Sequence, residues 1–496
     1  MQNKRDQVQA HMFLMGRLTS SMLRSDPDAP ESPQGRTNRG IAVGVIVAIL
    51  LAAGAFVLGL VSPGTTDSWR SSGDLIVDKN TGARYLFLDG RLRPVRNYAS
   101  AKLLTGGDLA TTTVGAKSLM GTPHGTPVGI EGAPDEVPGA GDLSGDPWQV
   151  CATPTKDATA RTGSLTTLAV GNGAGGDPLG KGQGVLVVGP GGTEYLLWQG
   201  SRLRLDRGSA AQEALGYASV TPVPVSAAFL NALPTGPDLA PPDIPGLGDP
   251  GPRLGDRSTR VGQIFQLAVP GSSARYYLLR EDGLTPLTAT EVALVLGDPH
   301  TRQKAYGGTS PAPVTLTSEA LKSHLAPGAG KTKGPGESPE NPPKPVTVPQ
   351  DQTLCARVTP QSKGTRVGVA LAANGDLGPV AQHSSPAAAA PCLPVDRITV
   401  PPGRGALVRA VGAGGGKVGS TLYLVTEAGV KYRLSTQDAV AALGYQDMSP
   451  EEMPALMLAM LPSGPDLSPG AAETGRTDVT APRCTWREQR DTPESN

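Results

Sequence analysis

Three glycine-rich strings are the residues of this sequence whose types and spacing could bind a phosphate. GAGKT (328–332) resembles the end of a nucleotide-binding loop of the form GxxxxGK[ST], in which backbone N–H groups cradle the phosphates and the lysine reaches them. However, Leu325 stands where that loop requires its first glycine. A proline-rich segment also follows where a phosphate-capping helix is required. The string therefore predicts a linker.

The other two strings lack different parts of a phosphate site. GAGGGKVG (412–419) has no Ser or Thr after Lys417, and a strand-like segment follows it. GNGAGG (171–176) satisfies GxGxxG after the strand-like TTLAV, but the next residues, DPLGKGQG, cannot start a helix. We expect both strings to form turns. The sequence therefore predicts no nucleotide or other cofactor.

The sequence also contains no recognisable motif for a hydrolytic site or a metal site. Neither a GxSxG nor an HExxH motif is present, the five histidines are scattered, and there is no CxxC pair. The carboxylate pair Glu451–Glu452 is predicted to lie at an exposed helix start. We therefore nominate no catalytic residue and no metal ligand, and we expect that the protein is not an enzyme.

The four cysteines predict two disulfides. All of them follow the longest apolar run of the chain, and an even number of cysteines outside the membrane favours disulfide bonds over metal binding. Cys151 and Cys355 occupy equivalent positions in the similar segments WQVCATP and TLCARVTP, so we predict a bond between them. Cys392 and Cys484 bracket the last repeat described below and form the second predicted pair.

Residues 41–61, IAVGVIVAILLAAGAFVLGLV, form an uncharged run that predicts a transmembrane helix. At 1.5 Å per residue the run spans about 31 Å, close to the thickness of a hydrocarbon core. A cleaved signal peptide is disfavoured because about 40 residues precede the run and it exceeds the usual apolar region of such peptides. A buried core helix is disfavoured because no polar face interrupts it.

The charges beside this run predict its orientation. The 24 residues before the run contain four arginines, whereas the first basic residue after it is Arg70. The positive-inside rule then places residues 1–40 in the cytoplasm and residues 62–496 outside. We expect a single-pass protein of the plasma membrane. The four arginines are Arg17, Arg24, Arg36 and Arg39.

The cytoplasmic tail carries one apolar stripe. In QVQAHMFLMGRLTSSMLR the apolar residues recur every three or four positions, as on one face of an amphipathic helix. Because so short a helix has no core of its own, we expect the stripe to lie on a partner protein or on the bilayer surface. A disordered tail is the alternative. The stripe consists of Val8, Met12, Met15, Leu18 and Met22.

The outer region contains repeats. The phrase LPTGPDLAP (233–241) returns 228 positions later as LPSGPDLSP (461–469). Each copy follows a strand-like hairpin and an alanine-rich run that ends in LGY, for which Gly216 and Gly444 are suitable C-terminal caps. ARYLFLDGRLRPV (83–95) and ARYYLLREDGLTPL (274–287) are weaker relatives of the hairpin. The four units centre on Tyr85, Tyr195, Tyr277 and Tyr432.

The order of the units predicts an internal duplication. A unit, a linker, a cysteine-bearing strand and a second unit occur in that order twice. Half of the outer region is therefore present twice, and the strands that carry Cys151 and Cys355 are the expected centre of a pseudo-two-fold body. A bond between these cysteines would close a loop of about 200 residues, for which chain entropy gives roughly 5 kcal/mol.

The expected fold class is α+β and β-rich. It combines a single transmembrane helix with an elongated pseudo-two-fold extracytoplasmic domain that has a central β domain and four small repeat units. Lysine plus arginine and aspartate plus glutamate are equal at 44 each, so no global charge favours nucleic acid. With 65 glycines and 48 prolines, long linkers are expected between the folded units.

The expected organisation in chain order is the following. The sequence predicts a cytoplasmic tail with an amphipathic helix (1–40), the transmembrane helix (41–61), repeat unit 1 (72–118), a linker (119–147), the first part of the central domain (148–181), repeat unit 2 (182–246), repeat unit 3 (259–325), a Pro/Gly-rich linker (326–350), the second part of the central domain (351–402), repeat unit 4 (403–484) and a polar tail (485–496).

Together these residues resemble the EccB component of actinobacterial type VII (ESX-like) secretion systems. The resemblance covers essentially the whole chain: QVQAHMFLMGRL is similar to the start of that family, and the single anchor, the four repeats and LPxGPDL follow in the family's order. The resemblance implies a structural subunit that organises an inner-membrane secretion complex through its outer repeats and inner tail.

The resemblance also implies the partners. These are other membrane subunits of the system, namely a multi-pass channel-like subunit and a motor ATPase of the FtsK/SpoIIIE type, together with self-association of the outer domain. Two alternatives stay open. Some family members carry an ATPase label, which would require a site that the glycine-rich strings do not supply. The repeats also resemble cell-wall-binding folds, so a peptidoglycan-binding module is compatible with a structural role.

Overall fold

The computed structural model describes most of the chain, in two compact units. One unit comprises residues 1–72, 76–83 and 112–123, and the other comprises 73–75, 84–111 and 124–496. The described residues are 4–24, 33–61, 67–71, 73–107, 109–156, 162–173, 175–268, 273–328, 338–361, 364–381, 388–412, 417–481 and 484.

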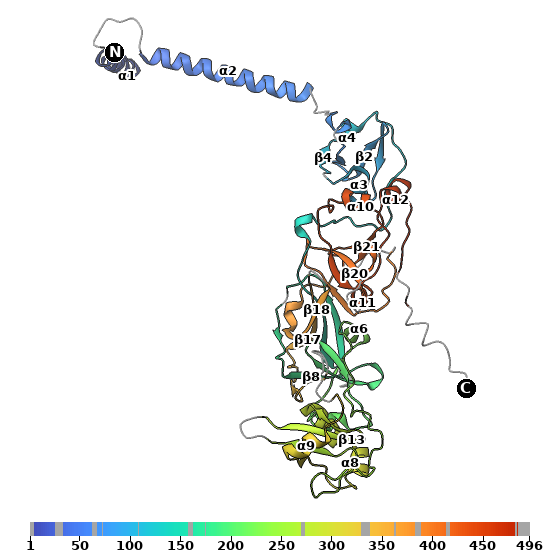
Figure 1. Ribbon diagram of the computed structural model, residues 1–496. Coiled ribbons are helices and arrows are strands. Elements are labelled where there is room, and N and C mark those ends of the chain that lie inside the picture. The colour runs from blue at the N-terminus through green and yellow to red at the C-terminus, as the bar shows by residue number, and fades with distance from the viewer. Residues whose placement is uncertain are drawn as a thin grey trace. The chain divides into compact units, whose positions relative to one another are not determined.

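The first unit contains the two long helices at the start of the chain, α1 (Lys4–Arg24) and α2 (Pro33–Val61) (Figure 1). The stretch Thr37–Val57 of α2 is long and apolar enough to cross a membrane, and its side chains are exposed. A long, predominantly apolar helix whose side chains are exposed with respect to the described residues is the pattern of a membrane span. The unit also contains the short helices η1 (Ser68–Arg70) and α4 (Ala116–Leu119), most of β1 (Leu75–Asp78) and most of β4 (Thr111–Val114).

Three small sheets of the second unit share one strand order. Counted in chain order, the first strand of each sheet pairs antiparallel with the second, and the second pairs antiparallel with the third. A short fourth strand pairs parallel with the first. The sheets are β10-β9-β8-β11, β14-β13-β12-β15 and β22-β21-β20-β23. Near the start of the chain, β2 (Arg84–Leu88) and β3 (Arg91–Pro94) form a similar hairpin. We refer to the unit that contains the β2–β3 hairpin as repeat 1, and to the units that contain β8, β12 and β20 as repeats 2, 3 and 4.

The strands of these sheets are short. They are β8 (Gln183–Val188), β9 (Glu194–Trp198), β10 (Ser201–Arg204), β11 (Val223–Pro224), β12 (Ile264–Leu267), β13 (Arg275–Arg280), β14 (Gly283–Leu287), β15 (Val314–Thr315), β20 (Ala406–Val411), β21 (Lys417–Val425), β22 (Lys431–Leu434) and β23 (Glu451–Pro454).

Short helices accompany the sheets of the repeats. They are α3 (Tyr98–Thr105), η2 (Ala140–Asp142), η3 (Pro190–Gly192), α5 (Ala211–Ala214), α6 (Ala227–Asn231), α7 (Ala289–Gly297), α8 (Pro299–Ala305), α9 (Ser318–His324), η4 (Asn374–Leu377), α10 (Gln437–Ala442), α11 (Ala455–Leu458) and α12 (Pro469–Thr474). Polar residues cap several of them: the Asn97 side chain accepts a hydrogen bond from the Ser100 N–H, and Thr288 and Glu291 form a capping box at α7.

A central six-stranded sheet joins the two halves of the second unit. Its order is β19-β6-β5-β17-β18-β7. The strands are β5 (Trp148–Lys156), β6 (Thr162–Ala169), β7 (Asp177–Pro178), β17 (Gln352–Pro360), β18 (Thr365–Ala373) and β19 (Arg397–Thr399). Trp148, Val150 and Ala152 alternate along β5 onto one face and belong to the largest buried apolar cluster.

The pairing of β5 with β17 places a local two-fold axis at the cysteines. Cys151 lies directly opposite Cys355 in the antiparallel register, and the hydroxyls of Thr153 and Thr353 lie 2.9 Å apart. The neighbours on either side, β6 and β18, pair antiparallel with β5 and β17 in turn. The two halves of the duplication therefore meet at the middle of one sheet.

Each half also contributes a helix to the core of the other half. Leu103 of α3 in repeat 1 is buried in the apolar cluster of repeat 4, beside Leu443. Leu294 of α7 in repeat 3 is buried in the cluster of repeat 2, beside Leu215. Both leucines stand six residues after the capping residue of their helix, so the two contacts are equivalent. Repeats 1 and 4 thus form one pair, and repeats 2 and 3 form the other.

The recurring phrase LPxGPDL runs parallel to the third strand of its repeat. Leu239 bridges Leu205 in repeat 2, and Leu467 bridges Leu434 in repeat 4. The aspartates of the two phrases pair with arginines of that strand: Asp238 with Arg204, and Asp466 with Arg433 at 2.9 Å. The phrase recurs because it closes the open edge of each hairpin.

A third, altered copy of this phrase went unrecognised in the sequence. In repeat 1, HGTPV (124–128) makes the equivalent parallel bridges, His124 with Leu92 and Val128 with Val95. Pro127 stands at the position of the aspartate, and the neighbouring Thr126 accepts hydrogen bonds from Arg93 at its carbonyl and hydroxyl oxygens. The spacing of the bridges is kept, while the leucine and aspartate that identify the phrase are lost.

We expect Gly464→Ala, in the phrase of repeat 4, to destabilise the outer region by about 3 kcal/mol, the upper end for overpacked cores. A Cβ at this position would lie 2.2 Å from Cε1 of Tyr432, whose ring is buried. The equivalent Gly236→Ala is the control, because its Cβ would lie 3.3 Å from Cγ of Leu203. Urea unfolding of the full chain measures both variants. Equal losses would contradict this account.

Two segments that were interpreted as linkers are packed. In 119–147, Val128 and Ile130 are completely buried. In 326–350, β16 (Lys344–Pro345) pairs parallel with β8, and the Pro343 carbonyl accepts a hydrogen bond from the Tyr217 hydroxyl. Proline lacks an N–H but keeps its carbonyl, so proline-rich backbone can still lie along a sheet edge.

The structure also bears on the polar motifs. Glu451 and Glu452 belong to strand β23 and are half-buried, so their interpretation as an exposed helix start is wrong: β-pairing with β20 overrides the local signal. Gly216 and Gly444 follow α5 and α10 with positive φ, as expected of C-terminal caps. In GAGKT only Gly328 lies within the described residues, and the polar tail 485–496 lies outside them.

Candidate functional site

The inner tail presents its apolar stripe on a continuous helix. In α1 the five predicted residues are all more than half exposed, from 52 % for Leu18 to 81 % for Met22. Helical geometry adds Leu14 and Leu23 to the edges of the same face, and both are exposed. Phe13 is exposed away from that face. A spacing of three or four positions between successive apolar residues does not identify Leu14, Leu23 or Phe13, so these three residues were not predicted.

The cysteines form two bonds in the structure. Cys151 joins Cys355 at a Cα–Cα distance of 4.0 Å and a sequence separation of 204, and both residues are completely buried. Cys392 joins Cys484 at a Cα–Cα distance of 5.4 Å and a separation of 92. The first bond connects the two central strands, and the second fastens the end of the chain to the loop before β19.

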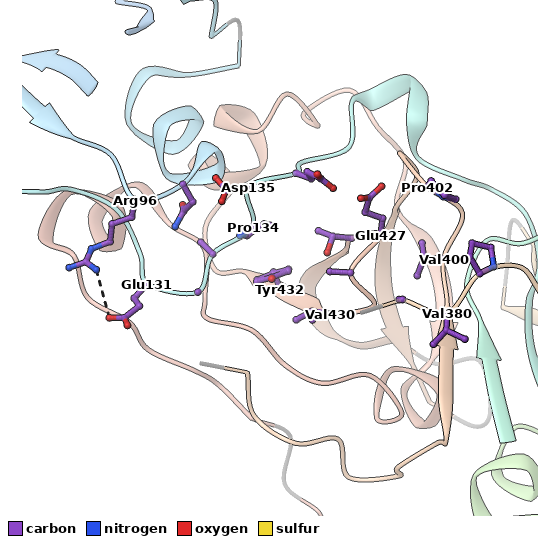
Figure 2. A pocket seen from close by; sticks show the side chains of 18 residues that line it. Arg96, Glu131, Pro134, Asp135, Val380, Val400, Pro402, Glu427, Val430 and Tyr432 are labelled. Carbon is purple, nitrogen blue, oxygen red and sulfur yellow. Dashed lines mark ion pairs between the residues drawn. The ribbon is translucent and has the colours of Figure 1, made fainter. Parts of the chain in front are cut away.

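A hollow lies between repeats 1 and 4, within the second unit. It is a pocket of ≈ 840 Å³ that the sequence analysis did not predict. Its walls come from the start of α3, the segment 131–136, the loops 379–381 and 400–402, and the β21–β22 turn (Figure 2). A second hollow of ≈ 540 Å³ shares Asp135, Glu136 and Glu427 with it.

Hydrogen bonds fix the segment that forms one wall of the pocket. The Ala99 N–H at the start of α3 donates to the Pro134 carbonyl, and the Tyr445 hydroxyl donates to the Pro138 carbonyl. Asp135 pairs with Arg84, while Arg96 and Glu131 form the ion pair drawn in Figure 2 at 3.9 Å. The wall is therefore anchored to both repeats.

Two carboxyl groups meet inside the pocket. The side chains of Glu136 and Glu427 hydrogen bond to each other, which raises the pKa of Glu136 and lowers that of Glu427. Glu427 also accepts a hydrogen bond from the Gly403 N–H. Apolar side chains complete the lining, with Val380, Val400 and Val430 around Glu427 in Figure 2. Two carboxyl groups in a hollow of this kind can bind a cation.

Beside the pocket, repeat 4 contains a buried lysine. The ammonium group of Lys431 donates to the carbonyls of Leu458 and Leu461, at 2.7 and 2.6 Å, near the C-terminal end of α11. Helix C-termini favour a positive charge, yet burial lowers the pKa of Lys431 to about 7. On β23, burial and then repulsion from Asp146 raise the pKa of Glu451 to about 7.

These two residues predict a minimum of stability near pH 7. Between pH 4.5 and 7 the folded state binds more protons at Glu451 than the unfolded state does, so stability falls as pH rises. Between pH 7 and 10.5 the unfolded state binds more protons at Lys431, so stability rises. Each limb has a slope of at most about 1.4 kcal/mol per pH unit.

Unfolding midpoints of the full chain across this range check the minimum. Glu451→Gln should remove the acidic limb and leave the alkaline one. Lys431→Met should flatten the alkaline limb only. A flat profile for the unmodified protein would contradict both assignments.

These features define a class: a single-span membrane protein whose outer region is a duplicated set of small β-rich repeats around a central sheet. The family model described as "Type VII secretion system ESX-1, transport TM domain B" matches residues 2–481. The chain therefore belongs to the EccB family of type VII secretion systems. It is a membrane component of that system, with a short inner tail and a large extracytoplasmic region.

Named relatives cover nearly the whole chain. The ESX-3 secretion system ATPase EccB3 of Mycolicibacterium smegmatis is 28 % identical over 94 % of this chain and 90 % of its own length. The ESX-1 secretion system ATPase EccB1 of Mycobacterium tuberculosis is 29 % identical over 94 % of this chain and 93 % of its own.

Solved structures agree on the fold. An EccB3 dimer from the ESX-3 core complex is 27 % identical, with a TM-score of 0.64 over 81 % of this chain and 99 % of that one. A chain from an intact ESX-5 inner membrane complex has a TM-score of 0.62 over 100 % of this chain and 98 % of that one, at 23 % identity. The β-rich fold predicted from the sequence is thus confirmed.

Proposed function

We propose that this chain is a structural subunit that holds a type VII secretion complex together from both sides of the membrane. The observation that carries the proposal is the combination of an exposed apolar helix face before the span with a large duplicated repeat region after it. A continuous face of seven exposed apolar residues marks a surface that binds a partner protein or a membrane. The repeats supply a second surface outside.

The proposed partners follow from the relatives. The solved relatives are parts of ESX inner membrane and core complexes, and one is a dimer. We therefore propose that the inner tail binds other membrane subunits, a multi-pass channel-like subunit and an FtsK/SpoIIIE-type motor ATPase, and that the outer region associates with a second copy. Cell-wall binding by the repeats is compatible with this role.

Mild-detergent purification of the tagged full chain from its own membranes tests the structural role. Mass spectrometry should identify both partner subunits at fixed ratios to the chain. A chain with the tail residues 1–24 deleted serves as the matched control and should recover fewer inner-side partners. Recovery of the full chain alone would contradict the proposal.

The relatives named as ATPases raise a second candidate function. We propose that this chain does not turn over ATP, because Leu325 replaces the first glycine of a nucleotide-binding loop and Lys331 is followed by a proline-rich segment. The purified full chain should release phosphate from ATP no faster than its Lys331→Ala variant. Turnover that follows the protein through purification and disappears in that variant would support an enzyme instead.

A further inference from the structure

The two hollows between repeats 1 and 4 form one groove, defined here as the pockets of ≈ 840 and ≈ 540 Å³ that share Asp135, Glu136 and Glu427. Asp135 is neutralised by Arg84. Among the described residues, Glu136 and Glu427 have no ion-pair partner and instead hydrogen bond to each other. Two carboxyl groups that hydrogen bond to each other share a proton, because two carboxylates in contact repel each other unless a proton or another cation lies between them.

The internal duplication supplies a comparison for this carboxyl pair. The Tyr445 hydroxyl donates to the Pro138 carbonyl, and the equivalent Tyr217 hydroxyl donates to the Pro343 carbonyl. This contact aligns DEVP (135–138) with ENPP (340–343), whereas the helix-start contacts of Ala99 with Pro134 and of Thr290 with Glu340 align Pro134 with Glu340. Glu136 is thus matched by Asn341 or Pro342, and neither is acidic. The other half builds the same backbone contact without the acid.

The second acid is also confined to one half. Glu427 precedes the positive-φ Gly429 in the hairpin turn of repeat 4, and Gln199 precedes the positive-φ Gly200 in that of repeat 2. Both side chains reach the turn before the first strand: Glu427 accepts from the Gly403 N–H, and Gln199 donates to the Lys181 carbonyl at 3.3 Å. The uncharged amide of Gln199 thus connects the two turns of repeat 2 as the carboxyl group of Glu427 connects those of repeat 4. The carboxyl pair is an addition that folding does not require.

A buried hydroxyl in the same groove also lacks a partner. Thr426 lines the larger pocket, is 1 % exposed, and its Oγ1 has no hydrogen-bond partner among the described residues. An unpaired buried hydroxyl costs about 1–3 kcal/mol, so such groups in native proteins call for an explanation. Thr426 immediately precedes Glu427 in the sequence, and both residues line the same pocket.

The shape and lining of the groove discriminate between ligands. Within the described residues no group of three or more metal-ligating side chains occurs, which disfavours a bare metal ion. The aromatic residues of the lining are Tyr432, which is buried, and Tyr98, which faces the Lys102 ammonium, so neither offers a free ring for a sugar. The remaining walls include valines, prolines and alanines, which suit an extended peptide, together with Arg96, which pairs with Glu131, and Arg404.

We propose that this groove binds an extended protein segment whose lysine or arginine inserts between Glu136 and Glu427. The basic side chain replaces the proton between the two carboxyls and makes charge-assisted hydrogen bonds to both. The valines and prolines of the wall contact the apolar neighbours of that residue in the segment. Because this site rests on residues 96–138 and 379–432 of the outer region, it is independent of the inner tail.

Calorimetry on the full chain in detergent tests the proposal with two peptides. The probe is acetyl-Val-Pro-Lys-Pro-Val-amide, and its uncharged counterpart carries norleucine in place of lysine. We expect the lysine peptide to bind at least tenfold more tightly, because its lysine makes charge-assisted hydrogen bonds to both the exposed Glu136 and the half-buried Glu427. Equal affinities would overturn the proposal.

Two double variants locate the site. Glu136→Gln with Glu427→Gln should lower the affinity for the lysine peptide at least tenfold and leave the norleucine peptide unaffected. Glu213→Gln with Glu340→Gln removes two exposed carboxylates elsewhere and should change neither affinity. Retained binding in the first variant would overturn the proposal, as would binding of Ca²⁺ or an N-acetylglucosamine oligomer at Glu136 and Glu427 in place of the peptide. Unchanged unfolding midpoints show that both variants fold.

Discussion

Replacing Met15 and Leu18 with aspartate is expected to abolish assembly of the secretion complex while leaving the protein folded and inserted. Both side chains lie in the middle of the exposed stripe of α1. In a contact with a partner each aspartate would become an unpaired buried charge, which costs about 3–5 kcal/mol. Even one such loss weakens binding by a factor of a hundred or more. Co-purification of the inner-side subunits and secretion measure the effect.

The matched control places the same charges on the opposite face of α1. Gln9→Asp with Ala10→Asp adds two aspartates that lie more than 100° around the helix from Met15, at the centre of the stripe, at 100° per residue. This variant should assemble normally. Normal assembly of the Met15 and Leu18 variant would show that the tail is dispensable and would leave the outer repeats as the organising surface.

The second large effect concerns the central disulfide. Cys151→Ala with Cys355→Ala removes a bond that closes a loop with a sequence separation of 204. Chain entropy then predicts a loss of about 5 kcal/mol, because the unfolded chain regains the freedom that the bond denied it. Both residues are completely buried where β5 pairs with β17, so removing the bond destabilises the central sheet that joins the two halves. Urea unfolding of the full chain measures it.

The other bond serves as the comparison. Cys392→Ala with Cys484→Ala opens a loop with a separation of 92, so the entropic loss is smaller by roughly 0.7 kcal/mol. Cys484 lies near the end of the chain, and we expect that variant to loosen the last residues while the central sheet persists. If removal of the central bond changed the unfolding free energy by less than about 1 kcal/mol, the chain-entropy account would be wrong.

The repeats could be predicted because their signals are local. A hairpin, a helix ending in LGY and the phrase LPxGPDL each occupy a short stretch, and the last two survive almost unchanged in repeats 2 and 4. In repeat 1 the phrase has become HGTPV, and only its bridges to β3 identify it. Backbone pairing keeps its spacing when side chains change, so sequence comparison loses the copy that the structure retains.

The groove could not be predicted, for a different reason. Its acidic residues come from segments nearly 300 positions apart, Glu136 in a proline-rich stretch interpreted as a linker and Glu427 in a hairpin turn. Neither stretch has a periodic pattern. No local sequence signal indicates that the β21–β22 turn of repeat 4 lies near the segment 131–136 that follows repeat 1. Contacts between distant irregular segments are where sequence reasoning is weakest.

The exchange of helices between the halves constrains how the protein matures. Leu103 finds its place beside Leu443, yet some 340 residues separate them in the order in which the chain emerges from the membrane. The first repeat to leave the translocon must therefore wait, with an apolar helix face uncovered, until nearly the whole polypeptide has been delivered. During that interval the nascent protein is exposed to proteases and to aggregation. A folding helper on the outer side would act on the uncovered face of α3.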